Sequence, residues 1–269
     1  MNKLTLSIFT KHWNNKPLET LAELTASLGF DGIEFPLREG YQLNPSKPET
    51  ELPRLVNMLK PYNLKVCSIA ADTTEAVFAG CAAAGIPLIR IMLMLNHNVK
   101  DNYFQDEAKM RHYIESFLPL CEKYNIKVGI QQHFMSRIKT AMEMRSLLAP
   151  YNPKLVGGIW DAAHSGLAGE APEQALDIMW DNLAIVNFKN AHYIPQENNL
   201  SSENFGRYFT TGQKGLCPWG RTIAHLQHRG YTGNICLPAE YTDEENTEAY
   251  AAEDIKYIKE LIIRAKQPY

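Results

Sequence analysis

The length and charge of this chain exclude several classes of protein before any motif is considered. Its 269 residues carry 27 Lys and Arg against 30 Asp and Glu, so there is no basic excess that would favour nucleic acid or an anionic membrane surface. No apolar stretch approaches the length that spans a bilayer, and the opening MNKLTLSIFT is typical of a first strand rather than a signal peptide. The composition is that of an ordinary soluble enzyme.

Short apolar runs alternate with amphipathic segments along the whole chain. Strands are predicted at residues 4–9, 31–36, 64–70, 87–95, 126–132, 154–160, 183–189 and 233–240. Helices, with apolar residues every three or four positions, are predicted at residues 18–29, 49–63, 73–85, 107–125, 140–152, 172–182, 219–230 and 249–266. Such alternation implies right-handed βαβ units and a parallel sheet. We therefore expect one (β/α)8 barrel domain over residues 1–269.

Two further features bear on this architecture. An open doubly wound sheet is the alternative, but KHWNNK follows the first strand, where that fold carries a glycine-rich phosphate loop. Residues 192–216 form a long polar segment after the seventh strand, and a loop of this length is typical of a functional element.

The cysteines bear on the cellular compartment. They form no CxxC pair, and their odd number argues against a disulfide framework. We expect buried free thiols and the reducing cytoplasm. The cysteines are Cys67, Cys81, Cys121, Cys217 and Cys236.

Polar side chains follow most of the predicted strands. In a barrel the carboxyl ends of the strands surround one cavity, so these side chains are the first candidates for chemistry. They are His12, Glu34, Arg38, Asp72, Asn96, His97, Gln131, His133, Asp161, His164, Asn187, Lys189, Asn190 and Glu240. We expect substrate contacts from Trp13, Glu34, Arg38, Asn96 and Asn190.

Several of these residues have a more specific interpretation. Strand periodicity places Gln131 with His133 on one face, and Asn187 with Lys189 on another. Asp161 follows a buried strand in IWDAAH and is expected to be functional, as are His133, His164 and the strand-ending Glu240. Glu34 has two open readings, a substrate contact or a structural ion pair with Lys189 or Arg90. The helical His112, His225 and His228 are expected to be packing or solvated residues.

Five segments together resemble a known family. They are GFDGIEF, KVGIQQH, VGGIWDAAH, IVNFKNA and GQKGLCPWGRTIAHLQHRGYTGNICLPAEY, of which the last is the most specific. The sequence resembles the xylose isomerase-like TIM barrels, a superfamily of sugar-phosphate isomerases and epimerases that also contains tagatose epimerases, inosose dehydratase and endonuclease IV.

The resemblance implies a divalent metal with an altered ligand set. In the sugar epimerases the cation is held by Glu, Asp, His and Glu from strands five to eight, and the matching residues here are Gln131, Asp161, Asn187 and Glu240. Amide oxygens still coordinate Mg²⁺ or Mn²⁺ but bring no charge. Alternatively, His133 or His164 joins the ligands, which suits Mn²⁺ or Zn²⁺.

The resemblance also implies an enzyme that forms an enediolate on a keto or aldo sugar, or on a sugar acid. Glu240 would abstract a proton, His164 or His133 would return it, and Lys189 with the cation would stabilise the oxyanion. Gln131 cannot be a base, which removes one of the two bases of epimerisation.

Other readings remain open beside this isomerase or epimerase. A lyase, either a dehydratase or a decarboxylase, needs one base and one acid. A non-catalytic sugar-binding barrel needs neither. The charge balance argues against an endonuclease. No Gly-rich loop or Arg cluster marks a phosphate site, although Arg207 and Lys214 lie in the long polar segment, so we favour an unphosphorylated carbohydrate substrate; a homo-oligomer remains open.

Overall fold

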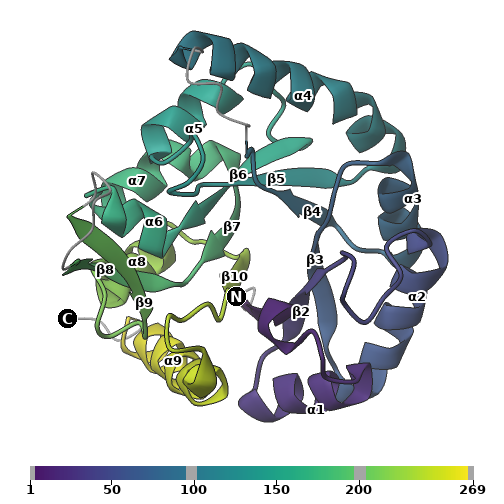
Figure 1. Cartoon of the computed structure of the whole chain (residues 1–269), viewed down its shortest axis with the longest axis horizontal. Helices are drawn as coiled ribbons and strands as arrows, with labels where there is room; N and C mark the ends of the chain where they lie inside the picture. The colour runs from purple at the N-terminus through teal and green to yellow at the C-terminus, as the bar shows by residue number, and fades with distance from the viewer. Residues whose placement is uncertain (1–3, 95–101, 197–203, 266–269) are drawn as a thin grey trace.

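Eight parallel strands close into a barrel with helices around its outside (Figure 1). The structure is a computed structural model that describes residues 4–94, 102–196 and 204–265. The barrel strands are β1 (Thr5–Phe9), β2 (Gly32–Pro36), β3 (Lys65–Ala70), β4 (Leu88–Ile91), β5 (Lys127–Gln131), β6 (Val156–Asp161), β7 (Leu183–Asn187) and β10 (Asn234–Leu237). Their order around the barrel is β1, β10, β7, β6, β5, β4, β3, β2, which confirms the expected (β/α)8 fold.

The helices begin and end at local sequence signals. They are α1 (Leu18–Leu28), α2 (Pro48–Leu59), α3 (Glu75–Ala84), α4 (Tyr103–Tyr124), α5 (Ala141–Leu148), α6 (Ala162–Leu167), α7 (Pro172–Met179), α8 (Trp219–His228) and α9 (Thr247–Arg264). Helix α4 begins earlier than predicted because Asn102 and Gln105 form a capping box. Helix α6 was not predicted. None of the described helices is long and apolar enough to cross a membrane.

The barrel interior changes character from its middle to its carboxyl end. An apolar cluster fills the middle, and it consists of Phe9, Ala70, Leu88, Ile159, Ile185 and Cys236. Gly129 makes room there, because a Cβ at this position would lie 2.7 Å from the Ile159 side chain. Above this cluster, strand alternation turns polar residues inward, and they are Glu34, Arg90, Gln131, Asp161 and Asn187. The polar site therefore lies next to a buried apolar cluster.

The long polar segment after β7 is largely a β-hairpin, which corrects our expectation of a loop. Strands β8 (Asn190–Pro195) and β9 (Phe205–Thr210) pair antiparallel, with Asn190 opposite Thr210 and Pro195 opposite Phe205. Strand β9 is tied to the end of the barrel, since the backbone N–H of Phe209 donates to the Thr242 hydroxyl at 2.9 Å and the Phe209 carbonyl accepts from the Thr242 N–H at 3.0 Å. The hairpin thereby lies over the carboxyl ends of the strands.

A buried carboxyl group anchors the segment that follows the hairpin. Asp254, on α9, is 1% exposed; its Oδ1 accepts from the Gly212 N–H at 2.7 Å, and its Oδ2 lies 2.8 Å from the Tyr241 hydroxyl. Burial raises the pKa of Asp254 to about 7, and the Gly212 and Tyr241 hydrogen bonds oppose this rise only in part. A neutral carboxyl group is therefore favoured in the folded protein.

This raised pKa predicts a pH-dependent stability. Between the unfolded pKa near 3.8 and the folded pKa of about 7, the unfolded chain binds fewer protons at Asp254, so the free energy of unfolding falls as pH rises. We expect Asp254→Asn, which keeps both partners and has no proton to lose, to flatten this dependence. Urea denaturation at pH 5, 6 and 7 measures it, using the slope of about 1.4 kcal/mol per pH unit for one proton as the reference. Parallel curves for the two proteins would contradict the assignment.

Candidate active site

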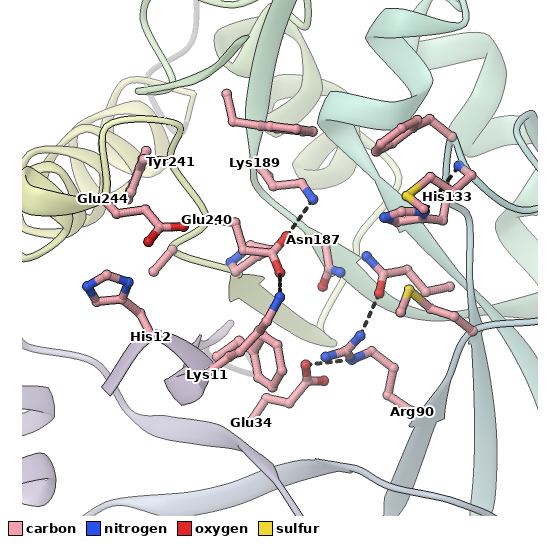
Figure 2. Close-up of a pocket in the computed structure, with 18 of the residues that line it drawn as sticks. Lys11, His12, Glu34, Arg90, His133, Asn187, Lys189, Glu240, Tyr241 and Glu244 are labelled. Carbon is pink, nitrogen blue, oxygen red and sulfur yellow. Dashed lines mark hydrogen bonds and ion pairs between the residues drawn. The ribbon is translucent and has the colours of Figure 1, made fainter. Parts of the chain in front are cut away.

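A cavity of about 790 Å³ opens at the carboxyl ends of the barrel strands (Figure 2). Its wall includes side chains from β2, β4, β5 and β7, from the turns after β1 and β10, and from β9. The charged and imidazole side chains that line it are Lys11, His12, Glu34, Arg38, Arg90, His133, Lys189, Glu240 and Glu244. Such a polar-walled cavity at this face is the expected place for chemistry in a barrel.

One side of the cavity floor is a buried ion pair. Arg90 Nε lies 2.7 Å from Glu34 Oε1, and the two side chains are 5% and 2% exposed. Ser68 Oγ donates to Glu34 Oε2 at 2.7 Å, and Arg90 Nη1 donates to Gln131 Oε1 at 2.7 Å. Of the two readings of Glu34, the geometry therefore supports the ion pair with Arg90, although Glu34 also reaches the cavity wall.

Asp161 is fully buried beside the cavity and does not line it. Gln131 Nε2 donates to Asp161 Oδ2 at 2.9 Å, and Asn187 Nδ2 lies 3.5 Å from the same oxygen. Asp161 Oδ1 accepts from the backbone N–H groups of Ala163 and His164, which makes it the N-cap of α6. Burial alone would raise the pKa of Asp161, but Lys189, His164 and these N–H donors together lower it, so the carboxylate is ionised.

Lys189 is the buried cation at the centre of the site. Its side chain is 2% exposed, and its Nζ lies 2.8 Å from Glu240 Oε2, 3.2 Å from His164 Nε2 and 4.0 Å from Asp161 Oδ2. The ammonium also lies 4.9 Å from the centre of the Phe209 ring, on the hairpin. Burial alone would lower the pKa of Lys189, but Asp161 and Glu240 raise it, so the ammonium keeps its charge.

Glu240 presents the carboxylate that reaches the cavity. It follows Ala239, which lies two residues after the end of β10 and has a φ of 50°, in the left-handed region. Its side chain is 34% exposed, and Lys11 Nζ donates to its second oxygen, Oε1, at 3.1 Å (Figure 2). Burial by itself would raise the pKa of Glu240. The ammonium groups of Lys189 and Lys11 lower it by more, so the pKa lies well below its usual range.

Two histidines of the site, His133 and His164, are neutral. Burial, reinforced by Lys189, lowers the pKa of His133 to about 4 and that of His164 to about 3. His133 Nδ1 accepts from the Met135 N–H at 3.2 Å, so the proton of the neutral ring is on Nε2. The ring centroids lie 4.3 Å apart, and the His164 side chain has no exposed surface. His133 can therefore donate into the cavity, whereas His164 acts through Lys189.

Some predicted substrate contacts lie away from the cavity. Trp13 is buried in the core, where its indole N–H donates to Glu248 at 3.2 Å. The Asn190 amide is buried and bonds the carbonyls of Gly212 and Cys217 together with the Cys217 N–H, so it holds the segment after the hairpin. Neither side chain lines the cavity. Asn96 and His97 lie outside the described residues.

Arg38 and the turn after β1 do reach the cavity. The Arg38 guanidinium lines the wall and makes no hydrogen bond or ion pair within the described ranges, while partial burial and Arg90 lower its pKa. His12 lies at the same rim, whereas the Asp72 carboxylate is bonded to Thr74. The Arg38 guanidinium is thus available to a ligand.

Sequence reasoning missed several residues of the wall, and three of them contact the candidate residues. Lys11 follows the first strand directly, a position that could have singled it out. Phe209 belongs to β9, and the alternation in FGRYFT was the overlooked signal. Phe134, whose ring lies 4.8 Å from that of His133, carried no signal apart from its position after β5.

The predicted divalent cation does not fit these residues as they are arranged. Asp161 and Glu240 share the Lys189 ammonium, and the Gln131 oxygen is taken by Arg90. Within residues 4–94, 102–196 and 204–265, no group of three or more His, Cys, Asp or Glu side chains is placed to hold a metal ion.

Comparison with known proteins places the chain in a family. A family model described as xylose isomerase-like TIM barrel matches residues 22–261. The chain belongs to the xylose isomerase-like TIM barrel family. Among curated proteins, this barrel is similar to inosose dehydratase of Bacillus licheniformis, with 26% identity over 165 residues. The match covers 58% of this chain and 55% of that protein, so it spans about half of the relative's length.

Solved structures share the fold across most of both chains. D-psicose 3-epimerase from Clostridium cellulolyticum H10 has a TM-score of 0.74 at 12% identity, over 96% of this chain and 99% of that one. L-ribulose 3-epimerase has a TM-score of 0.74 at 14% identity, over 98% and 96%. 3-keto-D-glucoside 4-epimerase from E. coli has a TM-score of 0.72 at 13% identity, over 96% and 100%. Sugar-processing enzymes thus share this xylose isomerase-like fold.

Proposed function

We propose that this protein is a sugar isomerase that moves a carbonyl group along a keto or aldo sugar, or a sugar acid, through an enediolate. The observation that carries the proposal is the Glu240 carboxylate, which is ionised, faces the cavity and lies 2.8 Å from a buried ammonium. A base beside a fixed positive charge is the arrangement that removal of a proton next to a carbonyl group requires.

The proposed step begins at the carbon next to the substrate carbonyl. Glu240 takes the proton from this carbon, the C–H electron pair forms a carbon–carbon double bond, and the carbonyl oxygen becomes an oxyanion held by the Lys189 ammonium. The nearby positive charge makes resting Glu240 a weak base. As the oxyanion forms against Lys189, it offsets that charge and raises the basicity of Glu240. The neutral His133 donates its Nε2–H to a substrate oxygen and fixes its position.

The side chains of the cavity wall that can accept a proton from the substrate favour isomerisation over epimerisation. After the hydroxyl proton of the enediolate has passed to the neighbouring oxygen, Glu240 returns its own proton to the former carbonyl carbon, so one carboxylate suffices. Inversion of a carbon needs a second base on the opposite face of the sugar. Gln131 cannot serve, and Glu34 is engaged by Arg90 and Ser68. Glu244 also lines the cavity, but it is exposed and none of the described side chains holds its carboxylate in position.

A dehydratase is the second candidate, and two observations favour it. The curated relative is an inosose dehydratase, and Lys11 Nζ lies 3.1 Å from the proposed base. After Glu240 removes the proton next to the carbonyl, the enediolate expels the hydroxyl group on the adjacent carbon. This group takes a proton from the Lys11 ammonium and leaves as water. For either reaction, the unpartnered Arg38 would hold a carboxylate of an acidic substrate.

The five free thiols, four of them buried, fit the proposed cytoplasmic location.

Exchange of carbon-bound hydrogen in deuterated water tests the proposal. We expect one sugar from a panel of aldoses, ketoses, keto-sugar acids and cyclic keto-polyols to lose a C–H signal in its proton NMR spectrum when incubated with the protein. Exchange with conversion between carbonyl isomers identifies the isomerase, and loss of water by mass spectrometry identifies the dehydratase. Sugar binding without exchange by any member would instead support a non-catalytic barrel.

A further inference from the structure

The residues that match the metal ligands of the epimerases make a different set of contacts in this chain. In this chain Gln131, Asp161, Asn187 and Glu240 still meet at the carboxyl end of the barrel, but Lys189 stands among them. Its Nζ contacts Glu240 at 2.8 Å and lies 4.0 Å from Asp161, the two acidic members of the set. The ammonium thus takes the two carboxylates that a cation at this place would need.

The orientation of Gln131 is fixed by partners of opposite character. Arg90 can only donate and an ionised Asp161 can only accept, so the amide oxygen faces Arg90 at 2.7 Å and the amide nitrogen faces Asp161 at 2.9 Å. If the Gln131 amide were flipped, its nitrogen would face the Arg90 donor and its oxygen would face the Asp161 carboxylate, so neither hydrogen bond could form. A cation beside Asp161 would therefore meet an N–H group from β5 where the epimerases supply a carboxylate oxygen.

The surrounding charge argues in the same direction. Lys189 and Arg90 are both buried, and both are held by short contacts to acidic or carbonyl oxygens. A divalent cation between them would be repelled by two fixed, buried positive charges. His164 offers no compensation, because its Nε2 already faces the ammonium at 3.2 Å.

We propose that the Lys189 ammonium replaces the divalent cation of the epimerases and that this site works without metal. The buried ammonium supplies the positive charge for an oxyanion, Asp161 and Glu240 hold it in place, and Gln131 fills the vacated ligand position with a hydrogen bond. The catalytic part of this statement rests on the proposed function. The absence of metal binding does not, so the two can fail separately.

Metal binding by the wild-type protein is the first test. After dialysis against a chelator, we expect titration with Mn²⁺ to leave the EPR signal of the free ion undiminished up to millimolar concentrations, and the melting temperature to be unchanged by Mn²⁺, Mg²⁺ or Zn²⁺. Metal analysis of the protein purified without chelator should find no stoichiometric cation. One tightly bound equivalent that is lost in Asp161→Asn would overturn the proposal.

A variant that restores the ligand pattern is the second test. Gln131→Glu combined with Lys189→Met returns a carboxylate and removes the ammonium, so we expect Mn²⁺ affinity to rise by at least about 100-fold, with a melting temperature that Mn²⁺ now raises. The matched control is Lys65→Met, which removes an exposed ammonium group at the first residue of β3. This variant should bind no metal. If the double variant does not fold, the wild-type titration decides alone. Tight Mn²⁺ binding by both the wild type and the variant would show that Lys189 does not replace a metal.

Discussion

Replacement of Glu240 by Gln is expected to lower kcat by about 10²- to 10⁴-fold, the usual contribution of a positioned general base. The amide has nearly the same volume and still accepts a hydrogen bond from Lys189, but it cannot take a proton from the substrate. The protein should fold normally, because Asp161 continues to neutralise Lys189. The rate of C–H exchange in deuterated water, measured with the sugar that the wild type exchanges, reports the loss.

The matched control for this substitution is Glu244→Gln. Glu244 lines the same cavity but is exposed at its mouth, and none of the described side chains is bonded to its carboxylate. We expect this variant to keep most of its activity. Equal losses in the two variants would show that the overall negative charge of the cavity, rather than a base at Glu240, supports turnover.

Replacement of Arg90 by Met should destabilise the protein by about 3–5 kcal/mol, the range measured when one partner of a buried ion pair is removed. Glu34 would be left with Ser68 as its hydrogen-bond donor, and Gln131 would lose the group that fixes its amide. Equilibrium urea denaturation, followed by tryptophan fluorescence and circular dichroism, measures the change in the free energy of unfolding.

Two controls separate the buried charge from a general effect of losing an arginine. Arg54→Met removes an exposed partner of Glu51, a pair separated by 2.6 Å, and should cost less than about 1 kcal/mol. Adding Glu34→Gln to Arg90→Met removes the unpaired carboxylate and should recover part of the lost stability. A single Arg90→Met variant as stable as Arg54→Met would contradict the picture of a desolvated pair.

The barrel fold could be predicted because its signals are local and repeated. Each strand is a short apolar run and each helix has a regular apolar period, so an error at one boundary leaves the order intact. The hairpin β8–β9 was missed because its two short strands, NAHYIP and FGRYFT, lie in a stretch of chain that is polar on the whole and are far apart in the sequence. Helix α6 was missed because its start depends on the Asp161 side chain, whose function as a cap became visible only in three dimensions.

The candidate site could be predicted as a set of positions but not as a set of contacts. Strand ends correctly brought Gln131, Asp161, Lys189 and Glu240 together. The sequence could not indicate that Lys189 would lie between the two carboxylates, since this depends on rotamers and on the left-handed turn at Ala239. Trp13 was wrongly predicted to contact the substrate. In the 3₁₀ turn after β1, His12 faces the cavity whereas the next residue, Trp13, packs in the core.

The charged side chains at and beside the cavity form a balanced row. Negative and positive groups alternate along it, and the sum of their charges is zero; the members are Glu34, Arg90, Asp161, Lys189, Glu240 and Lys11, with the neutral Gln131 as a spacer. A carboxylate in place of Gln131 would break the balance unless Lys189 changed as well. Gln131 and Lys189 are therefore electrostatically linked, and a change of charge at either position leaves an unbalanced charge unless the other position changes as well.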